Sequence, residues 1–172
     1  MFNEDLNHKL AMFDTVHLTT LAIFAIIIAC FYLFRGKIKN DKFEKIFRIT
    51  MGIFLLLMEG SYHIWLITRS SYSINMIPFT GFCATTHLFT VIALLTNKTK
   101  MFNYIIYYAL TGALLSIIFV DTSFTIPHFR FFHYFLVHFG FLIVSLYYFF
   151  TNRLEISKKY LIKSRLLKNT SL

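Results

Sequence analysis

Two side chains of this sequence have the chemistry of a nucleophilic pair. Cys83 carries a thiol, and His138 carries an imidazole that could accept the thiol proton. A thiolate is a strong nucleophile, but a thiol in apolar surroundings ionises only beside a base or a cation. His87, four residues after Cys83, is an alternative base because residues i and i+4 share one helix face. Such a pair would attack an acyl carbonyl; the alternative is that Cys83 is a small core residue.

Other ionisable side chains accompany this pair inside apolar segments. Glu59 and His63 also stand four residues apart. An ionisable residue within a membrane span is a functional candidate because its burial is costly. The candidate substrate-pocket residues are His17, Glu59, His63, Thr80, His87 and His133. Of these, Thr80 and His87 are candidate donors to an oxyanion.

The same polar residues allow a second interpretation, a zinc site. Its candidate ligands are Glu59, His63, His87 and His138. Carboxylate and imidazole groups bind zinc, but a tight ligand motif such as H-E-x-x-H is missing. We therefore expect no metal and no other cofactor, and a zinc-dependent hydrolase stays as an alternative.

The segments that must position these residues are membrane spans. Apolar residues make up 57% of the 172 positions, charged residues only 15%, and the mean hydropathy is +0.63. These values exclude an ordinary cytosolic domain, a disordered chain and a nucleic-acid-binding domain, despite the net charge of +9. A span needs about 20 mostly apolar residues. The predicted spans are residues 15–34, 47–67, 77–96, 101–120 and 130–150.

These spans place the polar residues in one layer. At a rise of about 1.5 Å per residue, Glu59, Cys83 and His138 lie about 12, 9 and 12 Å below the same membrane surface. The other half of the predicted bundle is almost purely apolar. The layer indicates a site within the membrane, although the rotation of each helix is not given by depth.

The basic residues predict the orientation of the bundle. Of the 17 Lys and Arg residues, fourteen fall on one side of a five-span protein, in residues 35–48, 97–100 and 153–168. The positive-inside rule then places the N-terminus outside and the C-terminus in the cytoplasm. We expect a multi-pass protein of the cell membrane, without a cleavable signal peptide.

The chain divides into one transmembrane bundle, residues 1–151, and a basic tail, residues 152–172. The tail mixes Leu, Ile and Tyr with Lys and Arg, which is typical of an amphipathic helix on the membrane surface. Gly112 and its small neighbours Ala109, Ala113 and Ser116 predict close helix packing. Such packing could also support a homo-oligomer or a partner membrane protein.

Several segments together resemble the YwaF-like bacterial integral membrane proteins. The matching segments are GFCATTHLF around Cys83, LTGALLSIIF, and IPHFRFFHYFLVHFGFLI, which contains Pro127, Phe129 and His138. VHLTTLAI and MEGSYHIW fit through His17 and Glu59. The same pattern is found in the related mammalian transmembrane acyltransferases of ether phospholipids. The order and spacing of the motifs over residues 15–150 carry the resemblance.

The resemblance implies lipid acyl chemistry, either acyl transfer or acyl hydrolysis. In that case Cys83 would be the acyl-accepting nucleophile and His138 the base. Membrane lipids are then the expected partners. Two alternatives of other classes remain open: a small transporter or accessory subunit that uses the polar layer as a path, and a structural partner of a larger membrane complex.

Overall fold

The computed structural model describes residues 10–68, 82–122, 124–151 and 153, and within them the chain forms five α-helices and no strand. The helices are α1 (Thr15–Leu33), α2 (Asp41–Thr68), α3 (Phe82–Thr96), α4 (Thr99–Ile118) and α5 (Phe129–Phe150). The all-helical fold and its five segments are confirmed. The predicted amphipathic helix of the tail and the candidate donor Thr80 lie outside the described residues.

Three of these helices, α1, α2 and α5, are long and apolar enough to cross a membrane. The apolar stretches of α3 and α4 are shorter, Cys83–Thr96 and Ile105–Ile118. At about 1.5 Å per residue, a stretch of that length covers only part of a bilayer core about 30 Å thick. The predicted orientation, with the N-terminus outside, stays a prediction.

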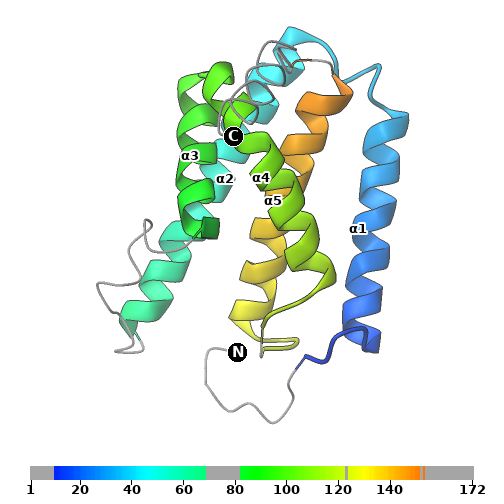
Figure 1. Cartoon of the computed structure of the whole chain (residues 1–172), viewed down its shortest axis with the longest axis vertical. Coiled ribbons are helices and arrows are strands. Elements are labelled where there is room, and N and C mark those ends of the chain that lie inside the picture. The colour runs from blue at the N-terminus through cyan, green and yellow to red at the C-terminus, as the bar shows by residue number, and fades with distance from the viewer. Residues whose placement is uncertain (1–9, 69–81, 123, 152, 154–172) are drawn as a thin grey trace, which may run out of the picture.

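Helix α5 lies at the centre of the bundle (Figure 1), where it contacts α4, α2 and α1. Helix α3 packs between α2 and α4. Helix α1 stands at the edge, and a stack of Phe24 on Phe139 at 4.0 Å attaches it to α5. Most of its other apolar side chains are exposed, as expected for a surface that lipid covers.

Two glycines allow neighbouring helices to approach closely. A Cβ atom at Gly52 of α2 would lie 2.7 Å from Leu95 Cδ2 of α3, and one at Gly140 of α5 would lie 2.9 Å from Leu55 Cδ2 of α2. The predicted contact at Gly112 is wrong within this chain, because a Cβ there meets no atom within 4 Å. The buried small residues of α4 are Ala109 and Ala113.

Replacing Gly52 by alanine is expected to lower the free energy of unfolding by about 1–3 kcal/mol. The added methyl group would meet Leu95 at 2.7 Å and Leu94 Cβ at 3.3 Å. Gly60→Ala is the matched control, because it lies on the same helix and a Cβ there meets nothing within 4 Å. Thermal unfolding in detergent measures both variants, and equal melting temperatures would contradict the close packing of α2 on α3.

The first turns of α2 are tied to the ends of α3 and α5. Arg48 is buried, donates a hydrogen bond to the Leu94 carbonyl and pairs with Glu44 at 3.2 Å. The Tyr148 hydroxyl donates to Glu44 Oε1 at 3.2 Å. The span predicted over residues 47–67 is therefore part of a longer helix, since α2 begins at Asp41. Arg48, which the sequence analysis uses only to predict the membrane orientation, therefore has hydrogen-bond and ion-pair partners within the bundle.

Candidate functional site

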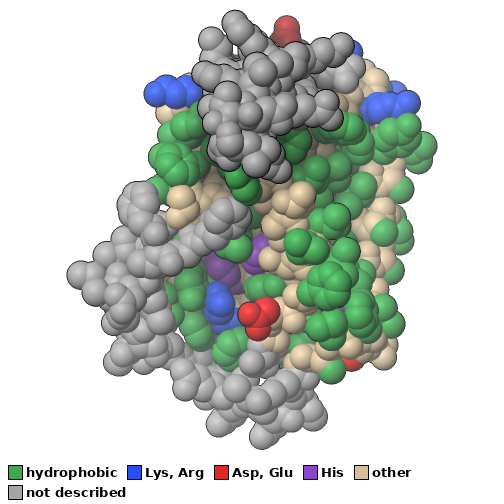
Figure 2. Space-filling view, viewed as in Figure 1, with side chains coloured by type: hydrophobic (Ala, Val, Ile, Leu, Met, Phe, Trp, Pro, Cys, Tyr) green, Lys and Arg blue, Asp and Glu red, His purple; other side chains and the backbone are tan. Residues whose placement is uncertain are grey.

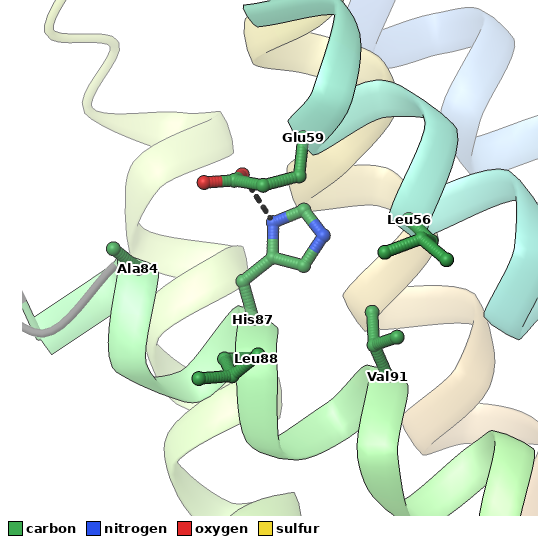
Figure 3. Close-up of a pocket in the computed structure, with 6 residues that line it drawn as sticks. All are labelled: Leu56, Glu59, Ala84, His87, Leu88 and Val91. Carbon is green, nitrogen blue, oxygen red and sulfur yellow. Dashed lines mark ion pairs between the residues drawn. The ribbon is translucent and has the colours of Figure 1, made fainter. Parts of the chain in front are cut away.

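The carboxylate of Glu59 joins two histidines from two helices. Glu59 Oε1 lies 3.2 Å from His63 Nε2 on the next turn of α2, and Oε2 lies 3.1 Å from His87 Nδ1 on α3. Figure 3 shows the Glu59 and His87 side chains pointing toward one another across the α2–α3 contact. The predicted i, i+4 pair is thus formed, and the cross-helix partner of Glu59 is His87.

Both ring nitrogens of His87 face hydrogen-bond acceptors. Its Nε2 donates to the Leu55 carbonyl at 3.0 Å, and its Nδ1 faces the Glu59 carboxylate. A backbone carbonyl can only accept, so Nε2 carries a hydrogen. The contact between Nδ1 and Oε2 then requires a second proton, which is held by one of these two groups. Glu59 and His87 therefore form a net-neutral pair, as a low-dielectric environment favours.

A small pocket opens beside this pair. It has a volume of about 30 Å³, and the residues that line it are Leu56, Glu59, Ala84, His87, Leu88 and Val91. A volume of that size accommodates about one water molecule. The pocket is too small to enclose a lipid acyl chain.

His138 is oriented for a different role. Its Nδ1 donates to the Tyr134 carbonyl one turn earlier on α5 at 2.7 Å, which leaves Nε2 with its lone pair. The ring lies 4.4 Å from the Tyr134 ring. The Tyr134 hydroxyl donates in turn to the Ser116 carbonyl of α4 at 2.8 Å. The His138 ring is therefore held by Tyr134, which is itself bonded to α4. In this orientation His138 presents a basic nitrogen, Nε2.

Cys83 is an exposed residue at the start of α3. The interpretation of Cys83 as a small core residue is therefore wrong. Its thiol lies within electrostatic range of Tyr134, the residue that orients His138. Cys30 on α1 is exposed as well, so exposure alone does not distinguish the two thiols. Cys83 differs from Cys30 in its position at the start of a helix and in its proximity to Tyr134.

Between His138 and the start of α5 lies a cluster of aromatic and basic side chains. Arg130 Cζ lies 4.3 Å from the ring centroid of Tyr62 and 5.8 Å from that of Trp65. Arg130 Nη1 donates to His133 Nδ1 at 3.2 Å, and the His133 ring stacks on Tyr62 at 5.0 Å. We call Tyr62, Trp65, Arg130 and His133 the Arg130 patch.

The sequence indicates His133 as a candidate substrate-pocket residue. It indicates no role in a site for Tyr62, Trp65 or Arg130. The available signal was Arg130 at the less basic end of the bundle, where the other basic residues are Lys9 and Arg69, together with Tyr62 and Trp65 at i, i+3 spacing.

His17 lies apart from the other candidates. It is fully buried, its Nε2 donates to the Ile117 carbonyl of α4 at 2.8 Å, and its Nδ1 accepts from the Phe13 amide at 2.9 Å. Both nitrogens are therefore engaged in joining α1 to α4. The role of His17 in a substrate pocket stays a prediction.

The structure thus brings Glu59, His63 and His87 together, and it places His133 and His138 on the neighbouring helix α5. Within electrostatic range, His87 also faces His138. Among the residues that the structure describes, no group of three or more His, Cys, Asp or Glu side chains could hold a metal ion. The zinc alternative therefore has no ligand set in that part of the chain.

Comparison with known protein families gives a match over most of the chain. The model of the TMEM164 family matches residues 12–171. No curated protein and no solved structure matches the chain.

Proposed function

The chain belongs to the TMEM164 family of transmembrane proteins, and we propose that it transfers or hydrolyses acyl groups of membrane lipids through Cys83 and His138. The resemblance to YwaF-like proteins and to mammalian lipid acyltransferases is part of this proposal. The observation that carries it is the hydrogen bond from His138 Nδ1 to the Tyr134 carbonyl at 2.7 Å, because it leaves Nε2 as the acceptor of a proton.

The contacts favour His138 over His87 as the base. His87 uses Nε2 and Nδ1 on Leu55 and Glu59, so it has no lone pair to offer to a thiol. For the same reason, His87 would have to leave a partner before it could donate to an oxyanion. Cys83, on the other hand, is the second residue of α3, where the helix dipole favours an anion.

The first half-reaction would form an acyl-thioester. His138 Nε2 accepts the proton of the Cys83 thiol, and Sγ attacks the ester carbonyl carbon. A C–S bond forms as the carbonyl becomes a tetrahedral oxyanion. When the oxyanion collapses, the ester C–O bond breaks, and the departing lipid alkoxide takes the proton from His138 Nε2.

The second half-reaction would return the enzyme to its starting state. His138 removes the proton of a lyso-lipid hydroxyl or of water, and that oxygen attacks the thioester carbonyl. The C–S bond breaks, and the Cys83 thiolate regains a proton from His138. The exposed position of Cys83 supports this scheme, because an acyl ester from the bilayer can reach an exposed thiol directly.

The acyl-enzyme can be detected as a mass increase. Purified protein incubated with a diacyl phospholipid is expected to carry one acyl chain on Cys83, removable by neutral hydroxylamine, because hydroxylamine cleaves thioesters. His138→Gln should reduce the rate of acylation by about 10²–10⁴-fold, the usual contribution of a general base. Acylation on Cys30 instead, or equal acylation in the His138 variant, would contradict the proposal.

A further inference from the structure

Arg130 has no acidic ion-pair partner among the residues that the structure describes. Its guanidinium stacks over Tyr62 and Trp65 and uses one N–H on His133. An arginine carries five N–H donors and no acceptor. A partly buried guanidinium in an apolar setting needs an anion nearby, since its desolvation is otherwise uncompensated.

The Arg130 patch therefore contains more donors than acceptors. Besides the remaining donors of Arg130, the Trp65 indole Nε1 is buried and has no hydrogen-bond partner in the described part of the chain. His133 Nδ1 is already occupied by Arg130. Arg130 Cζ lies 5.8 Å from the Trp65 ring centroid, so an acceptor from outside the chain could bind donors of both side chains. The ligand that suits a planar guanidinium fork is an oxyanion such as phosphate.

The position of the patch indicates where that oxyanion comes from. Arg130 is the second residue of α5, and Trp65 lies in the last turn of α2. Both are at helix ends, where Trp and Tyr mark the membrane–water interface. The phosphates of lipid headgroups lie at that level. We propose that the Arg130 patch binds the phosphate of a membrane phospholipid.

The other charged groups near the patch do not replace this anion. Glu59 is within electrostatic range of Arg130, but its two carboxylate oxygens are bonded to His63 and His87. Asp121 is exposed on the segment between α4 and α5 and forms no ion pair with Arg130 among the described contacts. Figure 2 shows histidine and basic side chains together in a hollow on one face, with an acidic side chain beside the basic one and apolar side chains next to them.

This inference goes beyond the proposed function, because binding of a phosphate needs neither Cys83 nor His138. The two are compatible in geometry. His138 lies eight residues after Arg130 on α5, which is about 12 Å deeper in the membrane. A phospholipid held at Arg130 by its phosphate would extend its acyl chains toward that depth.

The protein contains a single tryptophan, Trp65, so its fluorescence reports directly on the patch. Full-length protein in maltoside micelles is titrated with a dialkyl phosphatidylglycerol and, separately, with the matching dialkylglycerol. The ether linkages remove any ester, so acyl chemistry cannot contribute to the signal. Arg130→Gln removes the charge. Arg35→Gln is the matched control, because Arg35 also lies over a tyrosine ring, 3.9 Å from Tyr32, near the opposite end of the bundle.

We expect a saturable change in Trp65 emission with the phosphatidyl lipid and none with the dialkylglycerol. Arg130→Gln should weaken binding by at least about tenfold, whereas Arg35→Gln leaves it unchanged. Equal affinity of Arg130→Gln and wild type, or an equal response to dialkylglycerol, would overturn the proposal. An equal response to inorganic phosphate at the same ionic strength would also overturn it, since the site would then bind a free anion.

A second variant covers the case in which Arg130→Gln does not fold. Arg130→Lys keeps the positive charge but loses the planar fork and its stacking on Tyr62. We expect this variant to elute as the wild type does and to bind the phosphatidyl lipid several-fold more weakly. Unchanged binding by Arg130→Lys would contradict a role for the guanidinium.

Discussion

Replacing Cys83 by alanine is expected to abolish acyl transfer. The thiol supplies the bond-forming atom, so its loss should reduce turnover by about 10³-fold or more. Release of lyso-lipid from a defined phospholipid, followed by mass spectrometry, measures this effect. The exposed position of Cys83 indicates that little stability depends on its side chain, so the variant should stay folded.

Cys30→Ala is the matched control for Cys83→Ala. Both cysteines are exposed on helices, but Cys30 lies near the C-terminal end of α1, whereas Cys83 lies at the N-terminal end of α3. Its replacement should leave turnover unchanged. Full activity of Cys83→Ala would contradict the thioester mechanism. Loss of activity in both Cys83→Ala and Cys30→Ala would indicate an indirect effect of the substitutions.

Replacing Glu59 by leucine is expected to be the most destabilising single change in the polar layer. The substitution leaves His87 Nδ1 without its carboxylate partner in a buried position and also removes the partner of His63. Loss of one member of such a pair should lower the free energy of unfolding by about 2–4 kcal/mol. Thermal unfolding in detergent measures the loss, with Asp121→Asn, an exposed carboxylate, as the control.

A double substitution separates the cost of an orphaned group from the loss of packing. When both Glu59 and His87 are replaced by leucine, no polar group of the pair remains buried, so stability should recover by more than half. If the double variant is as unstable as the sum of its single variants, the two side chains act independently. That result would contradict the shared-proton pair between α2 and α3.

The sequence was sufficient to predict the five helices. Long apolar segments predict spans with little ambiguity, and the five helices follow them. Glu59 and His63 could be paired because their i, i+4 spacing is local. The start of α2 was predicted six residues late. The first two turns of α2, from Asp41 to Arg48, contain several charged residues and therefore do not look like part of a span. Their partners on α3 and α5 are distant in sequence.

The roles of the histidines could not be assigned from depth. His87 and His138 are predicted at similar depths, and the choice between them as base depends on the acceptor that each nitrogen faces. Helix rotation decides those contacts, and rotation is set by packing, for example by the close approach of α2 to α3 at Gly52. The Arg130 patch could not be predicted from the sequence for the same reason. Arg130 contacts Tyr62 and Trp65 only because α5 packs against α2.

The most direct test of the central claim is the rate at which Cys83 is alkylated. A lipid-like chloroacetamide is added to purified protein, and labelling of each cysteine is followed over time by mass spectrometry. Cys83 and Cys30 are both exposed, so Cys30 serves as a reference thiol in the same molecule. Cys83 is expected to be alkylated about 10²-fold faster than Cys30. In the His138→Gln variant, the alkylation rate of Cys83 should fall to that of Cys30. Equal rates of the two cysteines, or a Cys83 rate that does not depend on His138, would contradict the account.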